Sequence, residues 1–371
     1  MTDMTAPRFF TERDADAGAL AGHRVAIIGY GTLGRSAALN LRDSGVDVVV
    51  GNIADEYRER AVADGFAPAG LGDAAAQGDL VWVLLPDEVI PDCFGRDIAP
   101  RIRDGAAVCF ASGYVLAYGL VTAPPGIDVL LLAPRMSGGL VRQQYLAGEG
   151  FYSCVSAETD ASGVAWKRLL ALAAAVGSLR RGAIGLPAAQ EALLDLLIEQ
   201  TFGVYLGLGM QLAFRIGVEA GLPAEALVLE LYMSGEMAKT IEAFAAEGFF
   251  GSLLNHGLTA LYGGFTRTGE VDNEGMERMF RAAAGDIQNG GFARRFQREL
   301  ADGYPTVKAI QEMIAGSDPM TAAERKVRAA LDGQPLRSAR SFRPGWPQVQ
   351  LANGGERHED RRNGATEYRP V

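Results

Sequence analysis

The chain has 371 residues, 48% of them hydrophobic and 22% charged, with a formal net charge of −10 at pH 7. This length predicts two globular domains, and the charge argues against nucleic acid and anionic membranes as partners. Three cysteines, Cys93, Cys109 and Cys154, lack CxxC spacing and lie among apolar or small residues, so we expect buried thiols. The sequence shows no targeting pattern and no uninterrupted apolar run of about 18 residues, which predicts a cytoplasmic protein that binds a small molecule.

Apolar runs separated by helical or loop segments predict a parallel sheet with both faces covered, as in a Rossmann-type α/β domain. These runs are RVAII at 24–28, VDVVVG at 46–51, LVWVLLP at 80–86, AAVCFAS at 106–112 and DVLLLAP at 128–134. A helical pattern follows the first run and stops at Gly45. We assign residues 1–184 to this domain.

The character of the sequence changes after Pro187. Residues 188–221 and 224–248 carry apolar side chains at helical spacing, which predicts an all-helical domain over 185–332. The glycines of this region, such as Gly207 and Gly209, suggest close helix packing. Residues 333–371 are polar and rich in Arg, Gly and Pro, so we expect a disordered tail.

A GxGxxG motif, formed by Gly29, Gly31 and Gly34, directly follows the first apolar run and opens the helix after it. In that context the glycines permit a tight turn, backbone approach to a pyrophosphate, and close helix packing. The motif predicts dinucleotide binding, with a purely structural glycine turn as the alternative. The expected cofactor-binding residues are Gly29, Tyr30, Gly31, Thr32, Leu33, Gly34, Asn52, Asp55, Glu56, Leu85, Pro86, Ser112 and Gly113.

The loop after the second run should face the adenosine ribose of the cofactor. Asp55 and Glu56 come first in this loop, and acidic groups there favour the free 2′-hydroxyl of NAD. Arg58 and Arg60 follow closely and keep NADP open as the alternative. All four side chains also suit the solvated start of a helix.

Several segments together resemble the ketol-acid reductoisomerases, magnesium- and NADPH-dependent enzymes of branched-chain amino-acid synthesis. They are ERDADAGALAGHRVAIIGYGTLG, ALNLRDSGVDVVVG, LLPDEVIPD, IAPRIRDGAAVCFASGY, LLAPRMSGGLVRQQY, DLLIEQ and AAAGDIQNGGFARRF. The resemblance covers roughly residues 10 to 315. It implies a knotted helical domain that forms a homodimer or a higher homo-oligomer, with an active site between the two domains.

The resemblance implies Mg²⁺ ligands at Asp195 and Glu199, which are spaced i and i+4 and so share one helix face. Magnesium prefers carboxylate and water oxygens, and two acids in an apolar helix are costly to bury without a partner. A solvated helix face is the alternative. Glu236 matches a further acidic ligand or base of the family, but the acid expected one turn earlier is Tyr232, and Glu230 is six residues from Glu236.

Three other positions depart from the family pattern. Ser112 replaces a histidine near the nicotinamide, and Arg135 replaces a lysine, which changes an ammonium group to a planar fork. Gly257 matches a substrate-binding serine, with Leu261 where the family has Glu. His256, beside Gly257, is a candidate acid-base group, with a structural histidine as the alternative.

These departures lead us to expect a repurposed enzyme of specialised metabolism that acts on a small 2,3-dihydroxy or 2-keto-3-hydroxy acid. One such reaction is redox-neutral: the 2-hydroxyl is oxidised, the resulting enediolate displaces an internal sulfonium group to give a cyclopropanol, and the cofactor returns its hydride. The resemblance extends to the cyclopropanol-forming member of malleicyprol-type pathways. Alternatives are an authentic ketol-acid reductoisomerase, a simple imine or hydroxyacid dehydrogenase, and a non-catalytic cofactor-binding dimer.

Overall fold

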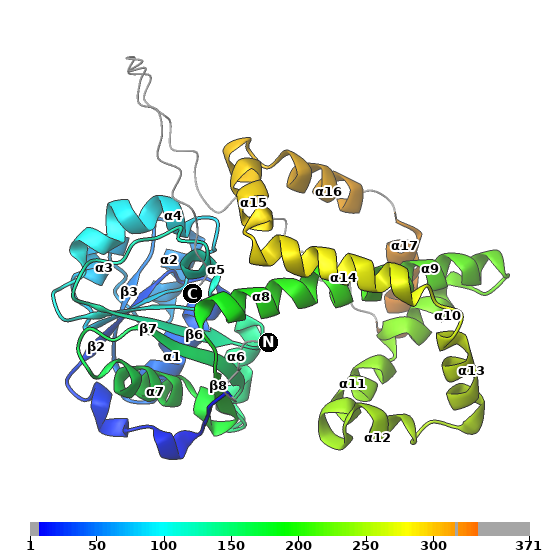
Figure 1. The fold of residues 1–371 in the computed structure, drawn as a ribbon, viewed down its shortest axis with the longest axis horizontal. Helices are drawn as coiled ribbons and strands as arrows, with labels where there is room; N and C mark the ends of the chain where they lie inside the picture. Colours follow the sequence, from blue (N-terminus) through cyan, green and yellow to red (C-terminus); the bar gives the residue numbers. More distant parts are fainter. Residues whose placement is uncertain (1–6, 316–317, 333–371) are drawn as a thin grey trace. The chain divides into compact units, whose positions relative to one another are not determined.

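The computed structural model describes residues 7–315 and 318–332, so the predicted disordered tail at 333–371 lies outside the described residues. Its organising element is an eight-stranded sheet with the order β1-β8-β7-β6-β5-β4-β2-β3 (Figure 1). The strands are β1 (Phe9–Phe10), β2 (Arg24–Ile28), β3 (Asp47–Gly51), β4 (Leu80–Val83), β5 (Ala107–Phe110), β6 (Asp128–Pro134), β7 (Tyr152–Thr159) and β8 (Gly182–Gly185).

The five predicted apolar runs form the parallel part of the sheet, β3-β2-β4-β5-β6. The remaining strands make the sheet mixed, because β7 pairs antiparallel with β6 and β1 pairs antiparallel with β8. The expectation of a Rossmann-type sheet followed by helices is confirmed, and that of a wholly parallel sheet is corrected. The predicted domain boundary after residue 184 falls inside β8 and stays a prediction.

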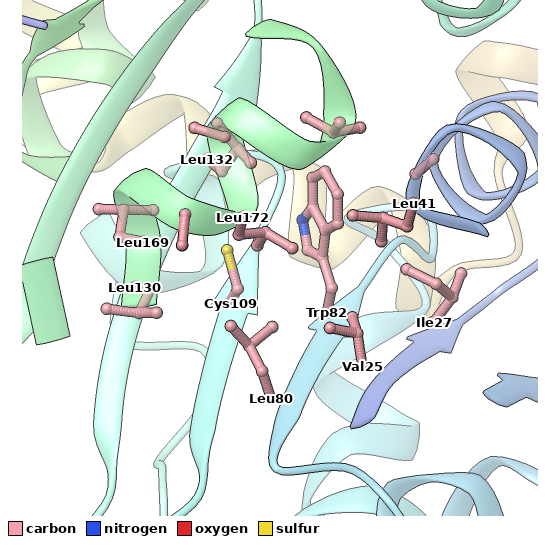
Figure 2. Close-up of a cluster of buried hydrophobic side chains, with 14 of the residues drawn as sticks. Val25, Ile27, Leu41, Leu80, Trp82, Cys109, Leu130, Leu132, Leu169 and Leu172 are labelled. Atoms are coloured by element: carbon pink, nitrogen blue, oxygen red, sulfur yellow. The ribbon is translucent and has the colours of Figure 1, made fainter. Parts of the chain in front are cut away.

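Helices α1 (Thr32–Asp43) and α7 (Ala165–Val176) cover one face of the sheet. Trp82 of β4 and Cys109 of β5 lie fully buried there against Leu172 of α7, and Leu41 of α1 belongs to the same cluster (Figure 2). The other helices of this region are α2 (Glu56–Ala63), α3 (Leu71–Ala75), α4 (Ile90–Cys93), α5 (Tyr114–Ala117) and α6 (Gly138–Leu146). All three cysteines are free and buried, as expected, and burial raises the pKa of the Cys93 thiol to about 12.

The rest of the described chain is helical, as predicted. Helix α8 (Ala188–Ile198) continues through a π-helical turn at Glu199–Gly203 into α9 (Val204–Glu219). The remaining helices are α10 (Ala224–Val228), α11 (Glu236–Glu247), α12 (Phe249–Leu253), α13 (Leu258–Thr268), α14 (Asn273–Gln288), α15 (Gly291–Ala301), α16 (Pro305–Ala315) and α17 (Pro319–Val327).

Much of this helical region is apolar and exposed. Phe202, Leu208 and Ile216 on the α8–α9 run are each at least half exposed. Gly207 and Gly209 meet open space rather than another helix of the chain, so their predicted packing role is not seen within one copy. By length and composition alone, the continuous helix Ala188–Glu219 is long and apolar enough to cross a membrane, and little of its apolar stretch is buried within one copy.

Candidate active site

The glycine turn after β2 has the geometry that the motif predicts. Gly29 has φ +100°, and a Cβ there would lie 2.8 Å from the Leu84 carbonyl oxygen at the end of β4. A Cβ on Gly34 would lie 1.9 Å from the Gly29 oxygen, so only glycine allows α1 to pack on the turn. Gly31 caps α1, and a Cβ there would meet nothing within 4 Å. The turn therefore leaves open space at the N-terminus of α1, where a pyrophosphate group is favoured.

Several other predicted cofactor residues brace this turn. The Tyr30 N–H donates to Asn52 Oδ1 at 2.8 Å, and the Tyr30 ring is fully buried. Asn52 Nδ2 in turn donates to Asp55 Oδ1 at 2.7 Å. Asn52 therefore holds the glycine turn and the loop after β3 in one arrangement. Leu85 lies against Gly29, whereas Pro86 is exposed.

The charged loop after β3 is largely engaged with its own backbone. Asp55 caps α2, which begins at Glu56, by accepting from the backbone N–H groups of Tyr57 and Arg58. The Arg58 guanidinium donates to the carbonyl oxygens of Asn52, Pro68 and Ala69. Arg60 lies over the Tyr57 ring, 5.5 Å from its centroid. The Arg58 guanidinium is therefore already bonded to the backbone and is not free to bind a phosphate.

At the ends of β4 and β5 the structure joins Ser112 to a residue that the sequence analysis missed, Asp87. Ser112 Oγ donates to Asp87 Oδ2 at 3.0 Å and accepts from the Tyr114 N–H at 3.1 Å. Burial and the neighbouring carboxylates Glu88, Glu191 and Asp195 raise the pKa of Asp87 to about 7. This edge of the sheet therefore carries a carboxyl group that titrates near neutral pH.

Glu191, also missed from the sequence, ties this edge to α8. Its side chain is 1% exposed and accepts from the Gly113 N–H at 2.6 Å, so this N–H is already satisfied within the chain. Arg135, which follows β6, donates to Glu191 Oε1 at 2.5 Å and to Asp195 Oδ1 at 2.7 Å. Burial raises the pKa of Glu191, and the Arg135 charge opposes that shift. Arg135 is therefore the cation that joins two carboxylates of α8.

Asp195 and Glu199 lie on the same helical run and influence each other. Partial burial and the Asp195 carboxylate raise the pKa of Glu199, with Arg135 acting in the opposite direction. With Glu191, the run presents three carboxylates, and in the described part of the chain Arg135 is the one cation paired with them. The run therefore carries more carboxylate charge than its one paired cation neutralises.

The other predicted catalytic residues are not brought to this place within one chain. Glu236 begins α11 after Gly235, which has φ +83° and breaks the helix, so Tyr232 and Glu236 do not share a regular helix as the spacing suggested. Tyr232 donates instead to Glu324 of α17. His256 is exposed between α12 and α13, just before the α13 cap residue Gly257. Within residues 7–315 and 318–332, no three His, Cys, Asp or Glu side chains form a metal-binding group.

Comparison with known proteins accounts for both halves of the chain. Residues 19–182 match the family model of the acetohydroxy acid isomeroreductase NADPH-binding domain, and residues 189–332 match that of the ketol-acid reductoisomerase C-terminal domain. The NADP(+) ketol-acid reductoisomerase of Pyrobaculum calidifontis is 37% identical over 88% of this chain and 99% of its own length. The NAD(P)(+) enzyme of Metallosphaera sedula is 35% identical over 86% of this chain and 96% of its own length.

A solved structure agrees with these matches. The structure of an NADH-preferring ketol-acid reductoisomerase from an uncultured archean has a TM-score of 0.81 and 29% sequence identity, covering 87% of this chain and 98% of that one. The glycine turn, the order of the two regions and the length of the match all lead to the same assignment. The chain belongs to the ketol-acid reductoisomerase family and is an NAD(P)-dependent oxidoreductase and isomerase of that type.

Proposed function

We propose that this enzyme acts on a small 2,3-dihydroxy or 2-keto-3-hydroxy acid other than the usual acetohydroxy acid. The arrangement of Arg135 carries the proposal. Its guanidinium fork holds Glu191 and Asp195 together, where the family pattern has a lysine. The planar guanidinium group is held in one orientation by its two carboxylate partners, whereas a single ammonium group would not be. The pocket beside α8 therefore differs in shape and charge distribution from one that has a lysine at this position. Ser112 in place of histidine changes the same site.

The chemistry that we favour is the redox-neutral formation of a cyclopropanol from a sulfonium-bearing dihydroxy acid. The C2–H bond of the substrate would give up its hydride to bound NAD⁺ while the C2 hydroxyl loses a proton, and the new ketone would acidify the neighbouring C–H bond. Loss of that proton gives an enediolate, which forms the ring as the C–S bond breaks and a neutral sulfide leaves. The hydride would then return to C2 and a proton to the oxygen on C2. The net change releases one sulfide and one proton.

NAD is the proposed preferred cofactor. Arg58 is held by three carbonyl oxygens and would have to give them up to reach a 2′-phosphate. Asp55 keeps one carboxylate oxygen, Oδ2, outside its capping bonds, and an acid at this position suits a ribose hydroxyl. The relatives named above include both NADP(+) and NAD(P)(+) enzymes.

Magnesium is the proposed metal, with Asp195 and Glu199 as its ligands. When bound, it would polarise the adjacent oxygens of a hydroxy acid as a Lewis acid. The Arg135 bond leaves the second oxygen of Asp195 outside that ion pair, and in the described residues Glu199 has no ion-pair partner. Both carboxylates can therefore serve as ligands without loss of the Arg135–Glu191 pair.

A homodimer is the proposed assembly, and it would complete the site. Helices α9, α11 and α13 expose large apolar side chains, and the same apolar surface on a second copy could bury them. Because Glu236 does not join Asp195 and Glu199 within one chain, we propose that it acts at the site of the partner copy. This assembly, rather than a membrane, would bury the apolar run Ala188–Glu219 in a cytoplasmic protein.

The test is the stoichiometry of nucleotide use. We would supply the sulfonium-bearing 2,3-dihydroxy acid with Mg²⁺ and a small, catalytic amount of NAD⁺, and quantify cyclopropanol and released sulfide by mass spectrometry. Many product molecules per NAD⁺, with no net change in NADH absorbance, support the proposal. Turnover of 2-acetolactate with one NAD(P)H consumed per product would instead favour an authentic ketol-acid reductoisomerase, which is the second candidate because the relatives carry that name.

A further inference from the structure

The Asp87–Ser112 pair lies on the nicotinamide side of the expected cofactor path. In doubly wound sheets the dinucleotide crosses the carboxyl ends of the strands, with its pyrophosphate at the first glycine turn. Here that turn follows β2, and the adenosine side is β3. Asp87 and Ser112 follow β4 and β5, which continue the parallel sheet in the opposite direction. The segment after β4 touches the turn directly, since Leu84 and Leu85 lie against Gly29.

The pair also borders the acidic helix. Gly113, next to Ser112, is held by Glu191 of α8, and a Cβ on Gly113 would lie 2.3 Å from the Ala188 oxygen. Ser112 therefore lies between the cofactor edge and the run that carries Asp195.

The hydrogen bonds leave Ser112 able to pass on a proton. A serine hydroxyl has one donor and two acceptor positions, and the Tyr114 N–H occupies one acceptor position. When Asp87 is ionised, the Ser112 hydroxyl donates to it, as the 3.0 Å contact allows. When Asp87 is protonated, it can donate to the second acceptor position, which frees the Ser112 proton for a substrate oxygen.

The surroundings of Asp87 favour the protonated form. The acidic groups that act on it are Glu88 from its own loop and Glu191 and Asp195 from α8, and its hydrogen-bonding partner Ser112 is neutral. Arg135 is already bonded to Glu191 and Asp195. Burial is the largest cause and, together with this repulsion, it outweighs the Ser112 hydrogen bond, which lowers the pKa. The pKa of Asp87 is raised to about 7, so its proton is exchangeable at neutral pH.

We propose that Asp87 and Ser112 form a proton relay that serves the hydride-transfer step in place of the family's histidine. The inference rests on the proposed nicotinamide chemistry. In the reduction direction, NAD(P)H gives a hydride to the carbonyl carbon and is oxidised, and the Ser112 proton moves to the carbonyl oxygen. The Asp87 proton refills Ser112, and the Asp87 carboxylate then takes a proton from water. The oxidation direction reverses each transfer.

The kinetic test follows reduction of 3-hydroxypyruvate, the smallest 2-keto-3-hydroxy acid, by NADH across a range of pH. Reduction needs protonated Asp87, so the wild-type rate should fall as pH rises through about 7. Asp87→Asn should abolish this fall in rate with rising pH, which we call the pH limb, and should slow reduction on the order of a hundredfold at low pH. Ser112→Ala should do the same, whereas Ser112→Thr, which keeps the hydroxyl, should retain the limb. Asp92→Asn, at an exposed position in α4, is the matched control.

A second readout does not depend on turnover. Infrared difference spectra of wild type minus Asp87→Asn should show the carbonyl stretch of a neutral carboxylic acid below pH 7, lost as pH rises. Absence of that band, or an unchanged pH limb in Asp87→Asn, would overturn the relay. If the wild type does not reduce 3-hydroxypyruvate while the band titrates as expected, the result counts against the proposed function. The protonated Asp87 carboxyl group would still be supported.

Discussion

Replacing Arg135 by methionine removes the cation that Glu191 needs and keeps much of the side chain's apolar stem. Glu191 is 1% exposed, and the Arg135 side chain is 27% exposed. Removing one partner of a buried ion pair typically destabilises a protein by about 3–5 kcal/mol, because the other charge stays buried and unpaired. Asp195 is 48% exposed, so its bond to Arg135 should contribute at most about 1 kcal/mol. We expect Arg135→Met to lower the free energy of unfolding by about 3 kcal/mol at pH values near 8.

The loss should depend on pH. Burial already raises the pKa of Glu191, and removal of Arg135 should raise it further above the unfolded value of about 4.3. A carboxyl group whose pKa is raised in the folded state loses stability as pH rises from the unfolded pKa through the folded pKa. As pH falls towards about 5, protonation of Glu191 in the variant becomes easier, so the loss should shrink towards about 1 kcal/mol for the missing hydrogen bonds.

Urea unfolding followed by circular dichroism at both pH values measures these losses. The double variant Arg135→Met/Glu191→Gln should recover part of the stability at the higher pH, because no unpaired charge remains. Asp195→Asn alone is the matched control for the exposed partner. An equal loss at both pH values, with no recovery in the double variant, would refute the assignment of Glu191 as a buried charge held by Arg135.

Four further variants test other parts of the structure. Asp195→Asn should abolish magnesium-dependent turnover and leave nucleotide affinity, measured by calorimetry, nearly unchanged; full turnover would count against the metal assignment. Gly31→Ala should fold normally but weaken NADH binding, whereas Gly34→Ala should also destabilise the fold, because its Cβ would meet backbone. Leu172→Ala should lower the free energy of unfolding by about 2–5 kcal/mol, since Leu172 is fully buried; a loss below about 1 kcal/mol would contradict the packing in Figure 2.

The parallel strands β2, β4, β5 and β6 were predictable because they are buried on both faces and so read as continuous apolar runs, and the edge strand β3 keeps an apolar run although it is partly exposed. The antiparallel additions were not, because β1 has two residues and β7 ends in the polar residues Glu158 and Thr159. The break before α11 was missed because apolar residues continue at helical spacing on both sides of it. The Ser234–Gly235 pair was the signal that a turn interrupts the helix.

The candidate site was predicted in part. Sequence spacing placed Asp195 and Glu199 on one face, and Glu191 continues the same i, i+4 series one turn earlier, which was the missed signal. Asp87 could not be found in this way, because its partner Ser112 is distant in sequence and comes close only through the β4–β5 pairing. Asp55 caps α2, as the alternative of a helix start allowed, and its predicted contact with the ribose stays a prediction. The carbonyl contacts of Arg58 depend on the folded loop and could not be read from the sequence.

The most direct test of the central claim is absorbance-monitored oxidation of NADH and, separately, NADPH by the purified protein with 2-acetolactate, with Mg²⁺ present or chelated. We expect nucleotide binding, with NADH preferred, but no substantial turnover of 2-acetolactate, because Arg135 and Ser112 have changed the pocket. Robust magnesium-dependent turnover would contradict that claim and would show that the reworked residues still support the family's usual reaction.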